Sequence, residues 1–325
     1  MTSAAGECEQ TQEAQGQHTP VLLKEVVDGL KIRPDGIYVD GTTGGGGHSE
    51  AIALRLGTGR LICIDKDESA LVFARKKLSA HVNKIDFVHD GFENLSGILD
   101  NLGFKQVDGV LFDLGISSMQ LDDPTRGFSL TQDGPLDMRL DRSAQMSAAD
   151  IVATYDHRRL ESVLRLNGEE RYARRISTAI VRARALEPIT STLQLAKIVT
   201  SAIPASSRTD AQHPAIRSFM ALRIETNGEL ALLHDSLLQS VSCLKPSGRI
   251  CVISFHSLED RIVKQTFAQL ARGCQCSKDL PVCICGKEPT LRIIKRKPTT
   301  PGTQEIEHNP RSRSGKLRVA ERLSV

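Results

Sequence analysis

A run of glycines after a short strand-like segment constrains the fold of this chain more than any other feature. Ile37, Tyr38 and Val39 form the segment, Asp40 ends it, and four consecutive glycines then precede His48 and a helix-like stretch. A strand, a glycine-rich turn and a helix start are typical of a nucleotide-type cofactor site, because glycine lets the backbone turn tightly and approach a ligand without a Cβ. The sequence therefore predicts an α/β fold with a cofactor at this turn.

The acid at the end of the strand narrows the class of cofactor. In a dinucleotide fold this turn presents amides to a pyrophosphate, and a carboxylate at Asp40 would repel the phosphates. S-adenosyl-L-methionine has no phosphate and carries a sulfonium and an ammonium group. The pattern therefore favours S-adenosyl-L-methionine and disfavours a nicotinamide oxidoreductase.

Short apolar segments alternate with helical patterns, which is typical of a parallel sheet covered by helices. We expect a Rossmann-like, seven-stranded, mostly parallel sheet with an antiparallel end strand. Its strands are predicted at residues 36–40, 60–65, 85–89, 109–113 and 249–255, with a terminal hairpin from residues 291–296 and 316–320.

The segment between the fourth and fifth strands consists almost wholly of helical patterns. Ser147, Asp156 and Ser191 or Thr190 are the expected N-caps, and residues 169–186 form the longest predicted helix. We interpret this segment as an inserted all-helical substrate-recognition domain, although an extended helical layer of one domain is the alternative. The predicted organisation is a disordered tail at 1–17, a cofactor-binding sheet domain at 18–125 and 226–325, and the insertion at 126–225.

Charge is unevenly distributed along the chain. The formal net charge is +3, but residues 1–17 carry three acidic and no basic side chains, whereas the segment from Lys287 onward carries ten basic and four acidic ones. A basic terminal segment is compatible with a polyanionic partner, and a solvated tail explains it equally well. The first residues fit neither a secretory signal nor a transit peptide. No apolar run approaches the roughly 18 residues of a membrane span, so we expect a cytoplasmic protein without a membrane partner.

Asp65 is the first candidate for binding the cofactor. It ends the second predicted strand, about twenty residues after the glycine turn, where a carboxylate can accept hydrogen bonds from both ribose hydroxyls. A helix N-cap is the alternative, but Asp67 is better placed for that role. Phe92, after the third strand, is predicted to flank an adenine ring or to belong to the core. His48 is predicted to contact the ligand or local backbone groups.

Asp113 follows the fourth strand, and Ser117 and Ser118 come shortly after it. Ligands bind outside the carboxyl ends of parallel strands, so these residues are expected to face the reaction. Amino-group methyltransferases place an acid, Asn or Ser here, which accepts a hydrogen bond from the target amine and localises its lone pair. Asp113 is the candidate for contacting the cofactor or the amine. His256, after the fifth strand, is the candidate for donating to a base edge, and Ser257 is a plausible helix cap.

Two charged segments lie in the predicted insertion. The helix at 169–186 carries one face of arginines that could bind phosphates, with a solvated face as the alternative: Arg171, Arg174, Arg175 and Arg182, extended by His213, Arg217 and Arg223. The loop at 126–139 is dense in glycine, proline and charge. Buried ion pairs are one explanation for it.

Four of the eight cysteines are close in sequence, as the pairs Cys274 and Cys276, and Cys283 and Cys285. Metal-binding pairs are usually separated by two to four residues, so this tighter spacing disfavours zinc, and we assign no metal. A disulfide is not expected in a reducing compartment. Cys63 and Cys251 lie within strands and are interpreted as small core residues.

The segments at 113–118, 126–129, 133–139 and 253–261 together resemble the bacterial family of small-subunit ribosomal RNA cytosine-N4 methyltransferases, which act on a decoding-centre cytidine of 16S rRNA. The resemblance covers nearly the whole chain except the acidic tail. It implies a methyltransferase domain with a helical insertion, S-adenosyl-L-methionine as cofactor, and 16S rRNA or the small ribosomal subunit as partner. Position by position, it implies cofactor contacts at Gly46, Gly47, His48, Asp65, Phe92, Asp113 and Gln120.

The sequence therefore predicts an enzyme that methylates the exocyclic N4 amine of one cytidine in 16S rRNA, with Asp113 and His256 as catalytic residues. The resemblance assigns Asp113 to the cofactor, which leaves its contact with the amine open. A DNA amino-methyltransferase is the first alternative, but such enzymes usually carry Pro-Pro-aromatic where Leu114 and Gly115 follow the acid here. A nonenzymatic RNA-binding assembly factor is the second. A homodimer is compatible with the sequence.

Overall fold

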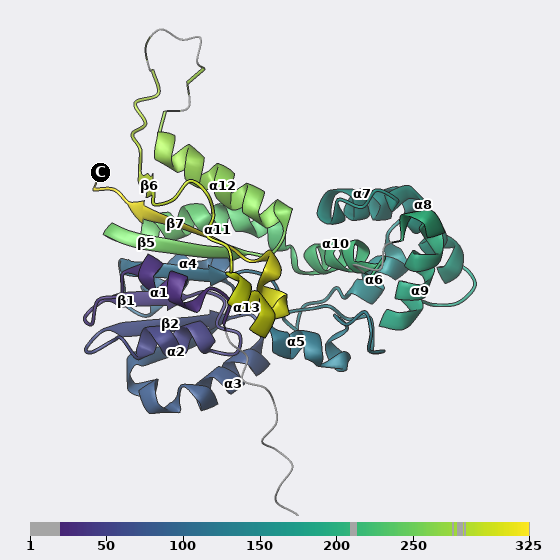
Figure 1. Cartoon of the computed structure of the whole chain (residues 1–325), viewed down its shortest axis with the longest axis horizontal. Coiled ribbons are helices and arrows are strands. Elements are labelled where there is room, and N and C mark those ends of the chain that lie inside the picture. Colours follow the sequence, from purple (N-terminus) through teal and green to yellow (C-terminus); the bar gives the residue numbers. More distant parts are fainter. Residues whose placement is uncertain (1–19, 209–212, 275, 278–281, 283, 325) are drawn as a thin grey trace, which may run out of the picture.

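The computed structural model describes residues 20–208, 213–274, 276–277, 282 and 284–324. The predicted disordered tail lies outside these residues. The described part contains a seven-stranded sheet in the order β3-β2-β1-β4-β5-β7-β6, as Figure 1 shows. Its strands are β1 (Ile37–Asp40), β2 (Arg60–Asp65), β3 (Ile85–His89), β4 (Val107–Asp113), β5 (Leu244–Ser254), β6 (Leu291–Ile293) and β7 (Lys316–Arg322).

The first five strands run parallel, and β7 pairs antiparallel with both β5 and β6. This confirms the predicted mostly parallel sheet and its terminal hairpin. Strands β2 and β3 lie on one side of β1, and strands β4 and β5 lie on the other. The chain therefore reverses its winding direction at β1 and β4, and ligands of open α/β sheets bind at such a point.

Side chains along the central strands alternate between two buried layers, because successive residues of a strand face opposite sides of the sheet. Tyr38 faces one layer and Val39 the other. One layer is covered by α1 (Leu23–Leu30), α2 (Gly47–Ala53) and α3 (Glu68–Lys77), and the other by α4 (Leu95–Asn101), α11 (Glu229–Cys243) and α12 (Ser257–Arg272). Cys63 and Cys251 are fully buried between strands and helices, which confirms them as core residues.

A second hydrophobic core lies outside the sheet. It runs from Phe128 to Leu222 in sequence and joins the helices to the right of the sheet in Figure 1. These are α6 (Ala148–Thr154), α7 (His157–Gly168), α8 (Ala173–Arg184), α9 (Thr192–Ala202), η4 (Ala205–Ser207) and α10 (Ile216–Asn227). The domain boundaries at 126 and 225 stay a prediction.

The helix caps lie at the predicted residues, but the predicted bounds of one helix are wrong. Ser147, Asp156 and Ser191 each accept a hydrogen bond from the first turn of α6, α7 and α9. The prediction of a longest helix at 169–186 is wrong: α8 begins at Ala173 and has 12 residues, whereas α12 has 16. Glu169 has a φ of 46°, a left-handed conformation that a helix cannot continue through.

The short elements near the sheet complete the fold: η1 (Ser79–Lys84), η2 (Phe92–Asn94), α5 (Ser118–Asp122), η3 (Pro124–Arg126), α13 (Thr303–His308) and η5 (Pro310–Ser314). Strand β5 begins at Leu244, earlier than predicted, and includes the expected turn, where Ser247 has a φ of 64°. Among the described residues, we find no helix that is both long and apolar enough to cross a membrane.

Candidate active site

Three aspartates end neighbouring strands at one edge of the sheet. Asp40 ends β1, Asp65 ends β2 and Asp113 ends β4. The strands are parallel and adjacent, with Asp40 beside Leu111 and Cys63 in the strand register, so the three carboxyl ends lie together. This edge is the predicted location of the cofactor.

The glycine turn after β1 folds back onto this edge. Gly44 and Gly46 have φ values of 49° and 75°, which side chains rarely adopt. A Cβ at Gly41 would lie 2.4 Å from Phe112 Cε1, so no larger residue fits there. Gly46 and Gly47, both predicted to contact the cofactor, lie at the start of α2, where a Cβ at Gly47 would come within 2.3 Å of Pro20 Cγ. The turn therefore packs tightly on the sheet side.

The Asp65 carboxylate connects the turn to β2. Its Oδ2 accepts a hydrogen bond from Gly44 N at 2.7 Å, and its Oδ1 accepts one from Asp67 N at 2.9 Å. Burial raises the pKa of Asp65 to about 6, although the two amides act in the opposite direction. Asp67 caps α3 by accepting a hydrogen bond from Ser69 N at 3.0 Å. This confirms the prediction that Asp67, and not Asp65, is the N-cap.

Asp40 does not line the site as the sequence suggested. Its side chain is 1% exposed, and its Oδ2 accepts from Ser49 Oγ at 2.6 Å while Oδ1 accepts from Thr42 N at 3.2 Å. Burial raises the pKa of Asp40. The expectation of a direct acidic lining at Asp40 is therefore corrected: this acid fixes the turn from inside. Ser49 and Thr42, which the sequence analysis did not single out, are its partners.

His48 and Asp113 face each other across the start of α2. His48 Nε2 lies 3.5 Å from Asp113 Oδ2, and the Asp113 amide donates to Thr42 Oγ1 at 2.6 Å. Both ring nitrogens of His48 and Oδ1 of Asp113 are buried without a hydrogen-bond partner among the described residues. Buried polar atoms are nearly always paired, so these atoms fit a polar ligand at the strand ends.

Phe92 stands between this edge and the core. Its ring centroid lies 4.8 Å from that of Phe112, with the planes tilted by 39°, and Lys66 Nζ lies 5.9 Å from the Phe92 centroid. Phe92 is only partly buried against the core that contains Phe112. The structure therefore shows Phe92 packed against the core, and a contact with adenine stays a prediction.

Both polar atoms of the Gln120 side chain form hydrogen bonds within the protein, and its predicted contact with the cofactor stays a prediction. Its Oε1 accepts from Ser117 N at 2.9 Å, and its Nε2 donates to Asp67 Oδ2 at 2.8 Å. The same Asp67 oxygen accepts from Arg126 Nη1 in an ion pair whose side chains are both 4% exposed. The Arg126 guanidinium also donates to the carbonyl of Arg139 at 2.9 Å. The charged loop at 126–139 is therefore held to the start of α3 by a buried ion pair, which agrees with the explanation given for its charges in the sequence.

His256 acts as the N-cap of α12. Its Nδ1 accepts from Glu259 N at 3.4 Å, and its Nε2 lies 3.1 Å from Glu259 Oε1. Burial would raise the pKa of Glu259, but the His256 side chain, Arg223 and the Phe255 amide lower it below its usual range. Ser257 is not the cap, which corrects that expectation. Both ring nitrogens of His256 face its own helix, and a contact with a base stays a prediction.

Ser257 instead connects the helical part to the sheet domain. Its Oγ donates to Glu169 Oε2 at 2.6 Å, and Arg261 Nη2 lies 2.9 Å from Glu169 Oε1. We call these three residues the Glu169 clasp. Since α12 begins at Ser257, shortly after the end of β5, the clasp holds the end of α7 beside the candidate site.

The predicted arginine face is only partly present. Arg174, Arg175 and Arg182 are exposed on α8 and Arg171 is exposed just before it, while Ile176 on α8 is buried. His213 and Arg217 are exposed as well. Arg223 is not part of this face, because its Nη2 lies 2.8 Å from Glu229 Oε2 and both side chains are largely buried.

The C-terminal segment returns to the site. Arg311 Nη2 lies 2.6 Å from Asp122 Oδ1 on α5, and Glu305 accepts from Leu22 N at 2.7 Å. Figure 1 shows α13 in front of the junction between the sheet and α5. Part of the basic segment is thus placed at the rim of the strand ends, a position that the sequence analysis did not foresee.

Comparisons with known proteins identify relatives of this chain. The model of the MraW methylase family matches residues 15–323. The chain is 50% identical over 308 residues to a ribosomal RNA small subunit methyltransferase H from Halothermothrix orenii, covering 94% of this chain and 99% of that protein. It is 50% identical to a protein of the same name from Paenibacillus and 47% identical to one from Clostridioides difficile, with the same coverage.

Proposed function

This chain belongs to the MraW methylase family, and on that premise we propose that it transfers a methyl group from S-adenosyl-L-methionine to the exocyclic N4 amine of one cytidine in 16S rRNA. The observation that carries the proposal is that Asp65, His48 and Asp113 all lie beside the glycine turn. Both ring nitrogens of His48 and Oδ1 of Asp113 are buried polar atoms that suit a ligand. Relatives at 50% identity are named as methyltransferases of small-subunit rRNA, which supports the choice of substrate.

The cofactor would be held by residues from three strand ends. We assign the ribose hydroxyls to Asp65, the adenine face to Phe92, and the amino acid portion to His48, Asp113 and the amides of the glycine turn. Bound there, S-adenosyl-L-methionine supplies an electrophilic methyl group on a positively charged sulfur. The carboxylates at this edge favour that charge, and Asp40 contributes by fixing the turn rather than by contact.

Asp113 is also our candidate for orienting the target amine. The lone pair of the cytosine amine is delocalised into the ring, and a hydrogen bond from the amine to a carboxylate oxygen localises it on nitrogen. Asp113 Oδ1 is buried without a partner among the described side chains and can accept that bond. Once nitrogen carries the methyl group, the amine gives up one proton, and the same oxygen is the nearest candidate to accept it. We assign His256 a positioning role: through its contact with Glu259 it fixes the start of α12 beside the end of β5.

The target cytidine must leave its base stack to reach this edge, which costs a few kcal/mol. We propose that the helical part and the basic C-terminal segment offset this cost by binding the flanking backbone. The exposed arginines of α8 and the placement of Arg311 beside α5 support this assignment. Each phosphate contact would add a salt-dependent contribution to the affinity. The substrate makes the cytoplasm the expected location.

The test is transfer of a labelled methyl group from the cofactor to rRNA. Purified chain is incubated with unmethylated small subunits, with naked 16S rRNA and with large subunits as the control, and the nucleosides are identified by mass spectrometry. We expect N4-methylcytidine in small-subunit RNA and none in the large subunit. Absence of transfer in every assembly state, or a methyl group on another atom, would contradict the proposal.

A further inference from the structure

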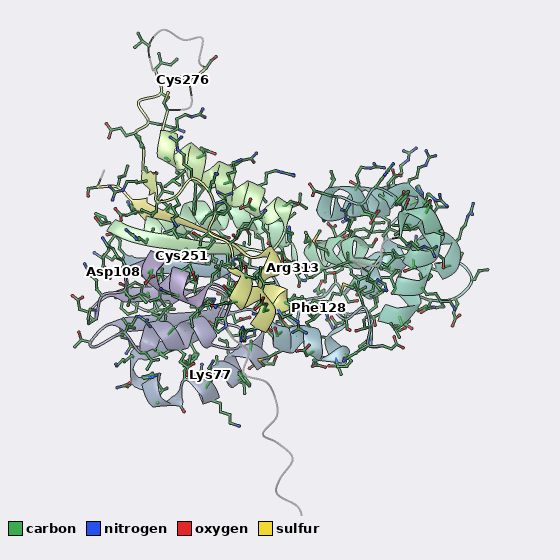
Figure 2. The ribbon with its side chains drawn as sticks, viewed as in Figure 1. Lys77, Asp108, Phe128, Cys251, Cys276 and Arg313 are labelled. Atoms are coloured by element: carbon green, nitrogen blue, oxygen red, sulfur yellow. The ribbon has the colours of Figure 1, made fainter. Side chains whose placement is uncertain are left out.

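An extension between α12 and β6 carries a cluster of cysteines that the methyl-transfer site does not use. Figure 2 shows Cys276 near the end of this extension, far from Cys251 in the sheet. Cys274, Cys276 and Cys285 are all partly buried, although the extension itself projects from the molecule. Core thiols such as Cys251 are fully buried, and burial raises the pKa of Cys251 to about 12. The three cysteines of the extension are therefore not explained as small core residues.

The two arms of the extension are fixed together at its base. Gly273 has a φ of 67°, and a Cβ there would lie 2.3 Å from the carbonyl carbon of Glu288. The Thr290 amide donates to the Leu270 carbonyl at 3.0 Å, and the Leu323 amide donates to the Thr290 carbonyl at 2.9 Å. This base brings Cys274 on one arm next to Cys285 on the other.

The spacing of the thiols matches a metal site. The sulfur atoms of Cys274, Cys276 and Cys285 all lie within 4.8 Å of one another, and those of Cys274 and Cys285 are 3.8 Å apart. A disulfide would require about 2.05 Å. Two thiolates on a tetrahedral zinc ion, each at about 2.3 Å from the metal, lie roughly 3.8 Å apart. The distance therefore fits shared coordination better than a covalent bond.

We propose that Cys274, Cys276 and Cys285 bind a thiophilic divalent cation, Zn²⁺, that crosslinks the two arms of the extension. The tight Cys-x-Cys spacing disfavoured zinc in the sequence, but the fold supplies ligands from opposite arms, so spacing within one arm is no longer the relevant distance. Each thiol loses a proton on binding, and no oxidant or reductant is needed. Cys283 lies outside the described residues, and the proposal rests on the three described thiols.

The metal has a structural role, because the extension lies at the opposite end of α12 from His256 and the strand ends (Figure 1). Val282 and Ile284 at the tip are 71% and 79% exposed, so little apolar burial is available to hold the tip in place. A metal crosslink is a common means of ordering such a segment.

The experiment is a metal analysis of the full-length chain, prepared with zinc in the growth medium and without chelators. We expect about one zinc per chain in the wild type and a loss of at least five-fold in Cys276→Ser/Cys285→Ser. Cys8→Ser, outside the described residues, is the matched control for general thiol binding and should keep the zinc. Zinc that persists in the double variant, or is lost equally in Cys8→Ser, overturns the site.

A second measurement uses only the wild-type chain, so it tests the site even if the double variant fails to fold. The reduced, metal-free wild type is titrated with Co²⁺, whose thiolate complexes absorb by charge transfer. We expect saturation near one equivalent and reversal by Zn²⁺. No zinc in the wild type together with no thiolate absorption overturns the proposal, as does a disulfide found by mass spectrometry in place of the metal. Neither measurement depends on methyl transfer, so the proposed function is tested separately.

Discussion

Replacement of Asp65 by alanine should disable cofactor binding while leaving RNA binding intact. The carboxylate accepts bonds from Gly44 and Asp67 amides at 2.7 and 2.9 Å, so it both shapes the turn and presents its remaining lone pairs to a ligand. We propose that two ribose hydroxyls donate to it, and loss of two bonds to a charged group at about 1.5 kcal/mol each amounts to about 3 kcal/mol. That corresponds to a roughly 150-fold rise in Kd for the cofactor.

Isothermal titration with S-adenosyl-L-methionine measures this directly, and filter binding measures rRNA affinity in the same preparations. Asp35→Ala is the matched control, because the Asp35 side chain is 73% exposed in the loop before β1, at the other edge of the sheet. We expect the control to bind the cofactor like the wild type. A cofactor Kd within three-fold of the wild type in Asp65→Ala, or an equal loss of rRNA binding, would refute the role assigned to Asp65.

The pH dependence of cofactor binding provides a second readout of the same residue. Burial raises the pKa of Asp65 from 3.8 to about 6, so the ligand-free protein takes up a proton there as the pH falls through 6. Protonation removes an acceptor, and cofactor affinity should therefore fall below about pH 6 in the wild type but not in Asp65→Ala. By linkage, this group lowers the free energy of unfolding of the ligand-free protein as pH rises from about 4 to 6, because the unfolded chain loses that proton first. Wild-type affinity that is flat across this range would contradict the assignment.

Three further predictions concern the rest of the site. Asp113→Ala removes the carboxylate oxygen that is assigned to accept from the target amine, so the methyl-transfer rate should fall by about 100-fold or more; a fall of only a few-fold would contradict its role. Arg126→Ala leaves Asp67 buried without its ion-pair partner, and urea unfolding should show a loss of about 3 kcal/mol; a loss below about 1 kcal/mol would mean that the pair does not hold the loop. Glu169→Ala opens the Glu169 clasp, so rRNA binding should weaken while the cofactor Kd is unchanged; the reverse pattern would place Glu169 in the cofactor site.

The sheet could be predicted from the sequence because its signals are local. Strands β2 and β3 have the predicted bounds, and the N-caps of α6, α7 and α9 follow from single residues such as Ser147 and Asp156. The predicted helix at 169–186 began too early, because residues 169–171 are charged and apolar spacing begins only at Tyr172. Glu169 ends α7 in a left-handed conformation, and its side chain bonds Ser257 and Arg261, more than eighty positions away, which no local pattern indicates.

The site residues could be located but their contacts could not. Asp65 and Asp113 follow from their positions at strand ends, whereas the inward bond of Asp40 to Ser49 depends on packing, and the cap made by His256 was missed because Ser257 was taken as the capping residue. Arg223 shows the same limit. Its helical position suggested an exposed surface, but its partner Glu229 lies across the turn at Gly228 and draws it into an ion pair. Sequence patterns indicate which edge of the sheet is used, and tertiary contacts decide which atoms are available there.

Nucleoside mass spectrometry of small-subunit rRNA from a strain that lacks this chain tests the central claim most directly. If the strand ends hold the methyl donor and the target amine together, the deletion strain loses N4-methylation at one cytidine. The wild-type chain restores it and Asp65→Ala does not. Unchanged N4-methylcytidine in the deletion strain, or full restoration by Asp65→Ala, would contradict the account.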